Sequence, residues 1–138
     1  MSPVKRQNIQ PPGIAPRVVR GHTLYSHVVA VEGGRRLVFL AGQLSRDANG
    51  QVVGKGDMRA QIVQTCENIK TALAAAGATL ADVVKTTTFV TDIDEFMRHV
   101  DVRLQYFGAA LPTSTTVEVR KLAQPDLLVE IEVMAVTD

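Results

Sequence analysis

The chain lacks several features that define large classes of protein. It has one cysteine, no tryptophan and only six aromatic residues among 138. Because the lone Cys66 cannot form an intramolecular disulfide, we expect a protein of a reducing compartment, the cytoplasm. No apolar run approaches the roughly eighteen residues of a membrane span, and the N-terminal residues contain no apolar core of a secretion signal. We therefore expect a soluble protein with no membrane partner.

The chain also has no excess of either charge. Its 15 lysine and arginine residues stand against 14 aspartate and glutamate residues, which gives a net charge of +1. Such a balance produces no long-range field that would capture nucleic acid or an anionic membrane. Few aromatic side chains and little net charge also leave little for base stacking or phosphate neutralisation, so no nucleic acid partner is expected.

Apolar residues are numerous enough for one hydrophobic core. They make up 46% of the chain, and its length fits a single domain spanning residues 1–138. Four prolines among the first sixteen residues remove backbone donors and fix φ. Residues 1–16 are therefore predicted to form an extended or loosely attached arm, with the fold beginning after it.

The first half of the chain reads mainly as strands. Residues 17–20 and 27–31 are short segments rich in valine, and residues 35–42 form a nearly continuous apolar run after a Glu-Gly-Gly turn. The glycine-rich residues 43–56 predict a loop or a small hairpin.

A first helix follows this loop. Asp57 is the predicted N-cap, and Gly77 is a natural end for the helix. Apolar residues recur at spacings of three and four, which places them on one helical face. This predicted stripe consists of Met58, Ile62, Cys66, Ile69 and Leu73.

The second half alternates strand, helix and two strands. Residues 81–90 are rich in β-branched residues and predict a strand, after which Asp92 and Glu95 resemble a capping box. Residues 113–120 and 127–136 predict the last two strands. The buried stripe predicted for the second helix is Phe96, Val100, Leu104 and Phe107.

The last two strands alternate in a way that bears on assembly. In the final strand one face carries Leu127, Val129, Ile131, Val133 and Ala135, and the other carries Glu130, Glu132 and Met134. In the strand before it, Thr115, Val117 and Val119 oppose Thr116, Glu118 and Arg120. Two helices can cover only one face of the sheet, and the second face is too apolar in places to be fully hydrated. We therefore expect this face to pack against other copies of the chain.

Seven short motifs run from about Tyr25 to the C-terminus. They read YSHVV, LVFLAGQ, ENIKTALAAAG, DVVKTTTFVTDIDEF, YF, PTSTTVEV and VEIEVMAV. In these motifs and in the order of its elements, the chain resembles the RidA (YjgF-type) family of reactive-intermediate deaminases. The resemblance implies an α+β, chorismate-mutase-like domain with a mixed six-stranded sheet, two helices on one face and a homotrimer with ligand clefts between subunits. It also implies hydrolysis of enamines or imines to a carbonyl compound and ammonia, without metal or organic cofactor.

The resemblance also indicates candidate site residues. In the family, a proline is followed two residues later by an arginine that binds the substrate carboxylate, but here Pro112 is followed by Thr113 and Ser114. A serine hydroxyl offers one neutral donor in place of a charged, two-pronged guanidinium, so capture of simple imino acids should be weaker. Polar contacts to a ligand from Ser114 and Thr116 remain expected.

Other positions of the family site are partly retained. The family's SGQ reads Ala41-Gly42-Gln43, which removes a hydroxyl, and Val100 stands where an asparagine is often found. The resemblance implies that Tyr25, Ala41, Gly42, Gln43, Ser114 and Thr116 line the substrate cleft. It assigns Glu130 to catalysis, as the carboxylate that orients or activates water.

Simpler interpretations compete at several positions. Cys66 lies on an apolar stripe and is predicted to be a buried packing residue rather than a nucleophile. His22, His27 and His99 have no partner at metal-ligand spacing, so no metal site is predicted. Glu130 beside Glu132 could equally belong to a hydrated or interface surface with salt bridges.

Three functions therefore stay open. The first is hydrolysis of an enamine or imine whose recognition does not need the missing arginine. The second is a non-catalytic trimer that binds a small metabolite or a partner protein through the same clefts. The third is action on RNA, which the charge and the aromatic content disfavour.

Overall fold

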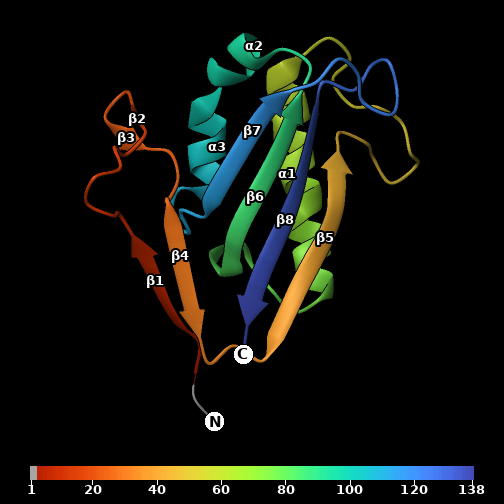
Figure 1. Ribbon diagram of the computed structural model, residues 1–138. Coiled ribbons are helices and arrows are strands. Elements are labelled where there is room, and N and C mark those ends of the chain that lie inside the picture. Colours follow the sequence, from red (N-terminus) through yellow and green to blue (C-terminus); the bar gives the residue numbers. More distant parts are fainter. Residues whose placement is uncertain (1–2) are drawn as a thin grey trace.

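The computed structural model describes residues 3–138 and centres on a four-stranded sheet (Figure 1). The strand order is β5-β8-β6-β7, and the bounds are β5 Arg36–Leu44, β6 Val83–Val90, β7 Thr113–Glu118 and β8 Val129–Thr137. β8 pairs antiparallel with β5 and β6, whereas β6 and β7 pair in parallel. The α+β class predicted from the sequence is confirmed.

The helices cover one face of this sheet, behind it in the view of Figure 1. α1 spans Met58–Ala75, and a single 3₁₀ turn, η1, spans Leu80–Asp82 before β6 begins. α2 (Ile93–Met97) and α3 (Val100–Phe107) form the crossover between the parallel strands β6 and β7. Among residues 3–138, every helix is too short or too polar to cross a lipid bilayer.

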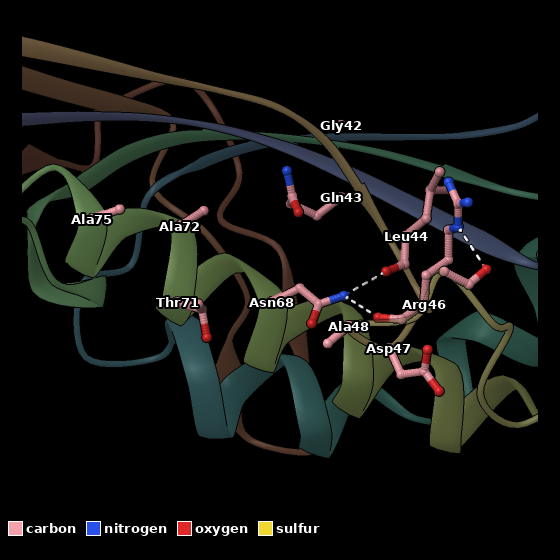
Figure 2. Close-up of a pocket in the computed structure, with 11 residues that line it drawn as sticks. Gly42, Gln43, Leu44, Arg46, Asp47, Ala48, Asn68, Thr71, Ala72 and Ala75 are labelled. Carbon is pink, nitrogen blue, oxygen red and sulfur yellow. Dashed lines mark hydrogen bonds between the residues drawn. The ribbon is translucent and has the colours of Figure 1, made fainter.

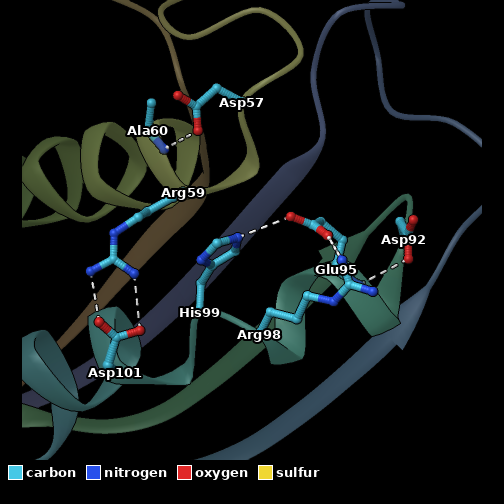
Figure 3. Close-up of polar contacts among 8 residues, drawn as sticks. All are labelled: Asp57, Arg59, Ala60, Asp92, Glu95, Arg98, His99 and Asp101. Carbon is cyan, nitrogen blue, oxygen red and sulfur yellow. Dashed lines mark hydrogen bonds and ion pairs between the residues drawn. The ribbon is translucent and has the colours of Figure 1, made fainter.

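Both ends of α1 follow the sequence prediction. The Asp57 carboxylate accepts a hydrogen bond from the Ala60 N–H at 3.0 Å, which satisfies a donor of the first turn (Figure 3). After the last turn Gly77 adopts a φ of +73°, the left-handed conformation that glycine allows at helix ends. α1 is tied to α3 by a two-pronged ion pair from Arg59 to Asp101, with contacts of 3.0 and 2.6 Å.

The second predicted helix is divided in two, which corrects the expectation of two helices. Asp92 caps α2 by accepting from the Glu95 N–H at 3.0 Å. The Glu95 carboxylate then binds Arg98 at 2.9 Å and the His99 ring at 3.1 Å (Figure 3). His99 leaves the helical region at ψ 27° and becomes the N-cap of α3. The chain therefore bends at Arg98 and His99, between the end of α2 and the start of α3, and the two helices run in different directions.

The core lies between α1, α3 and the covered face of the sheet. The predicted stripe of α1 is fully buried, and Cys66, Ile69 and Leu73 have no exposed surface. The predicted alternation of β8 is also confirmed, because the five residues of its apolar face are all buried. They are Leu127, Val129, Ile131, Val133 and Ala135.

The N-terminal strands do not join the central sheet, which corrects the predicted six-stranded sheet. β4 (Val28–Glu32) pairs antiparallel with β1 (Lys5–Ile9), and β2 (Val18–Val19) pairs with β3 (His22–Thr23) in a separate hairpin. Among residues 3–138, β5 pairs with β8 alone, so the Glu-Gly-Gly turn redirects the chain instead of closing a β4–β5 hairpin. Part of the predicted N-terminal arm is thus a paired strand.

The β1–β4 hairpin is fastened to the segment that leads into β7. Asn8 donates to the carbonyls of Ala110 and Leu111 at 3.0 and 2.9 Å, and Arg6 also donates to Ala110 O. The Ser26 N–H donates to Pro112 O at 3.1 Å. These bonds join residues about a hundred positions apart, so the hairpin holds the start of β7 in place.

Within the described residues 3–138, no helix or strand covers the second face of the central sheet. Phe39 of β5 is 70% exposed and Val117 of β7 is 40% exposed. Thr115 lies on the same uncovered face, whereas Ser114 and Thr116 turn toward the helices because Ser114 is paired with the buried Thr86. The alternation of β7 was predicted correctly, but its more apolar side is the uncovered one.

The burial of Cys66 generates a test of the fold. Removal from water raises the pKa of its thiol to about 12, so almost no thiolate exists at pH 8. We expect the native protein to react with a disulfide reagent such as DTNB at least about a hundredfold more slowly than the urea-unfolded protein. The absorbance of the released thiolate measures both rates, and rapid stoichiometric labelling of the native chain would contradict this packing.

Candidate functional site

The candidate site residues do not gather in one place. Tyr25, Ser114 and Thr116 line a pocket between β7 and the helices α2 and α3. Gly42 and Gln43 line a groove between the end of β5 and α1. Glu130 alternates with buried neighbours on β8 and therefore points to the uncovered face of the sheet. Ala41 is exposed beside Gly42.

The pocket beneath α2 and α3, here called the helix-side pocket, has a volume of about 220 Å³. This is below the roughly 300–1,000 Å³ of sites for drug-sized ligands, so one chain offers room for a small molecule only. Most of its wall is apolar, with Leu24, Ile93, Phe96, Met97 and Val100. Its polar groups are Arg17, Tyr25, Arg103, Ser114 and Thr116.

Arg103 is the residue of this pocket that the sequence analysis missed. It projects from α3, is only 5% exposed, and has its guanidinium carbon 5.7 Å from the centre of the Phe107 ring. Burial lowers its pKa to about 10, which leaves the guanidinium charged at neutral pH. Among residues 3–138, no carboxylate lies within ion-pair distance of it. The signal in the sequence was its position three residues after Val100 and four before Phe107, on the buried stripe of the helix.

One hydroxyl fixes the direction of the Arg103 side chain. Thr86 of β6 donates its hydroxyl proton to Thr113 O at 3.2 Å. Its oxygen then accepts from Arg103 Nη2 at a longer 3.4 Å. Because a guanidinium has five N–H donors, this single weak bond leaves most of its hydrogen-bonding capacity unused.

Tyr25 forms another wall of the helix-side pocket. It is half-buried, and its ring meets His27 edge-on with ring centres 5.4 Å apart. The His27 ring in turn contacts Ala15 O at 2.9 Å, which links this wall to the N-terminal segment. Among residues 3–138, His, Cys, Asp and Glu nowhere gather in a group of three that could hold a metal ion.

Glu130 and Gly42 are brought into direct contact across β8 and β5. The register of these strands shifts between Leu40 and Gln43, and this bulge contains Gly42. A methyl group at Gly42 would overlap Glu130 Oε1 and lie 2.8 Å from Glu130 Cδ. The half-buried Glu130 carboxylate therefore lies directly on the backbone of Gly42. It can lie there because glycine has no side chain to occupy that space.

The groove on the other side of Gly42 has a volume of about 690 Å³ (Figure 2). Asn68 of α1 donates to the carbonyls of Leu44 and Arg46, both at 2.9 Å, and these bonds hold the loop after β5 against the helix. Arg46, Asp47 and Ala48 are exposed, so this space is a surface groove rather than an enclosed pocket.

Comparisons with known proteins agree with this fold. The endoribonuclease L-PSP family matches residues 18–137. A RutC family protein of Pyrococcus horikoshii is 41% identical over 106 residues, which is 77% of this chain and 82% of that protein. The 2-iminobutanoate/2-iminopropanoate deaminase of Bos taurus is 37% identical over 113 residues, which is 81% of this chain and 79% of the deaminase. A crystal structure of a conserved Rid family protein from Yersinia pestis has a TM-score of 0.82 and 34% identity, and the match covers 95% of this chain and 98% of that one.

The contact between Gly42 and Glu130 can be tested by adding one methyl group. In Gly42→Ala the new methyl group displaces the flexible end of Glu130, so the free energy of unfolding should change by less than about 1 kcal/mol. The ¹³C resonance of the Glu130 carboxyl group should nevertheless shift. Gly34→Ala is the matched comparison, because its methyl group would overlap the buried Val136 side chain.

The Gly34→Ala variant should lose about 1–3 kcal/mol of stability in urea unfolding, since Val136 cannot move aside. Equal destabilisation of the two variants, or an unmoved Glu130 resonance in Gly42→Ala, would contradict the described contact.

Proposed function

The chain belongs to the endoribonuclease L-PSP family, and we propose from this premise that it hydrolyses a reactive enamine or imine to a carbonyl compound and ammonia. Support comes from the similarity to a deaminase of 2-iminobutanoate and 2-iminopropanoate over most of both chains. The observation that carries the proposal is the half-buried Glu130 carboxylate lying directly on the side-chain-free backbone of Gly42.

In this proposal Glu130 acts as the general base. Hydrolysis of a C=N bond requires water to attack the carbon while a proton leaves that water, and a carboxylate within hydrogen-bond distance accepts it. The same group returns that proton to the imine nitrogen, which gives a carbinolamine. It then carries the proton of the carbinolamine hydroxyl to the nitrogen, so that the C=O bond forms, the C–N bond breaks and ammonia leaves. An enamine would enter this reaction as its imine tautomer. The half-buried backbone of Gly42, which carries no side chain, would allow the substrate to approach the carboxylate closely.

The site would be shared between two copies of the chain. Glu130 faces the uncovered side of the sheet, whereas Tyr25, Ser114 and Thr116 face the helices, so a single chain cannot offer all of them to one small ligand. A second copy seated on the uncovered face would bring its own helix-side pocket to Glu130. We propose a homotrimer in which three such contacts close on themselves.

Ser114 changes what this site would select. A guanidinium at this position would bind a carboxylate with two parallel hydrogen bonds, while the serine hydroxyl offers a single neutral one. The proposed substrate is therefore bound differently from the small imino acids named for the bovine relative. A non-catalytic trimer that binds a small metabolite or a partner protein is the alternative, and the losses at Ser114 and Ala41 favour it.

The homotrimer generates a prediction about mass. Three chains of 14.9 kDa give a particle of about 45 kDa in light scattering. Phe39→Glu should reduce this to a single chain, because it puts a charge on the apolar uncovered face. Val63→Glu, which alters an exposed valine of α1 on the opposite side, should leave the trimer intact. A Phe39→Glu particle of unchanged mass would show that this face is not the contact.

Imine hydrolysis tests the activity directly. An amino-acid oxidase generates a panel of imino acids, and the rate of ammonia release is compared for the natural chain, Glu130→Gln and Ser114→Arg. We expect the natural chain to accelerate hydrolysis of at least one imine and Glu130→Gln to lose about 10²-fold or more of that rate. Ser114→Arg should shift the preference toward the smallest imino acids.

One result would reject the deaminase proposal, and another would reject only the role of Glu130. If the natural chain and Ser114→Arg are both inactive on the whole panel, the non-catalytic alternative gains. If Glu130→Gln keeps full activity, Glu130 is not the base, whatever the substrate.

A further inference from the structure

A charged group without a counterion lies inside the helix-side pocket. Arg103 is 5% exposed, and its only hydrogen bond to another side chain among residues 3–138 is the 3.4 Å bond to Thr86. A cation removed from water is costly unless an anion or several acceptors accompany it. The lining of the pocket contains no aspartate or glutamate, and the second charged group there is the exposed Arg17. Within one chain, the pocket is therefore electropositive and its lining supplies no anion.

Arg103 and Ser114 line the same pocket from different elements. Thr86, which accepts from Arg103, is paired with Ser114 across the parallel strands β6 and β7. Ser114 is therefore the residue directly across the strand pair from the one that Arg103 contacts, in the pocket that both residues line. The positive charge absent from β7 is thus present in the same pocket, but it comes from α3.

We propose that Arg103 binds the carboxylate of a small 2-oxo or 2-imino acid in the helix-side pocket. The planar guanidinium offers parallel N–H groups that match the two oxygens of a carboxylate. Ser114 and Thr116 line the same pocket, and their hydroxyls can hydrogen-bond the oxo or imino group. The apolar wall that includes Leu24 and Val100 suits a short alkyl chain.

This inference deepens the proposed function and rests on it for the identity of the ligand. It specifies that the substrate carries a carboxylate, which Arg103 of α3 binds, and is not a neutral intermediate. An incoming carboxylate neutralises a charge that the folded chain already keeps out of water, so binding offsets a cost that folding has incurred. The predicted selectivity is therefore for charge first and for side-chain size second.

Calorimetric titration of the full chain with 2-oxobutanoate and with its neutral amide tests the proposal without requiring turnover. The natural chain should bind the acid at least about tenfold more tightly than the amide. Arg103→Gln should bind the two compounds within about threefold of each other, after circular dichroism has established that it is folded. Arg35→Gln removes an exposed charge outside the pocket and should keep the natural preference.

Two further variants guard against a folding defect in Arg103→Gln. Arg103→Lys keeps the charge but not the planar pair of donors, so its preference for the acid should be reduced but still present. The double variant Arg103→Gln with Ser114→Arg should recover the preference, because it supplies a guanidinium from the neighbouring strand.

Several outcomes would overturn the proposal. These are equal binding of acid and amide by the natural chain, an unchanged preference in Arg103→Gln, or no recovery in the double variant while Ser114→Arg alone prefers the acid. Failure of the proposed hydrolysis is a separate result. Binding of the acid through Arg103 with no imine turnover would retain the anion site and reject the deaminase, whereas turnover that Arg103→Gln leaves unchanged would do the reverse.

Discussion

The rest of the structure depends on α1 packing against one face of the sheet. The buried stripe of α1 meets the apolar face of β8, and together they exclude water from the core. Strand side chains alternate between the two faces, so this one contact assigns each neighbouring residue to a side. Ser114 and Thr116 consequently face the helices, and Glu130 faces outward. A site that uses both sets of groups would therefore have to form between two copies of the chain, because within one chain the groups lie on opposite faces of the sheet.

The parts of the fold that are local in sequence could be predicted. The stripe that contains Cys66, the Asp57 cap and the alternation of β8 follow from periods of 3.6 and 2.0 residues, and the structure confirms them. The partner of β4 could not be predicted, because a strand has two edges and its sequence does not state which neighbour will occupy each. The covered side of β7 was equally undetermined, since threonine and valine suit both faces of a half-buried strand.

The candidate site shows a different limit. The family resemblance predicts an arginine at the position of Ser114, but such a comparison considers only the positions that belong to the family's own site. Arg103 lies on a helical stripe, where an arginine is usually taken for a surface residue whose stem packs on apolar neighbours. The position of Arg103 in the helix-side pocket follows only from the fold, which places α3 beside β6 and β7. The contact between Gly42 and Glu130 likewise depends on the bulge in β5, and no pattern in the sequence predicts that bulge.

The bonds between the β1–β4 hairpin and residues 110–112 have a consequence for biosynthesis. The hairpin leaves the ribosome early, yet the carbonyls that receive Asn8 and Arg6 are made about a hundred residues later. Contacts so distant in sequence form slowly and only after intervening chain has been ordered. During translation the first strands must therefore wait without their final partners, and an N-terminal pair of β-strands with open edges is the segment for which a nascent-chain chaperone would have most to protect.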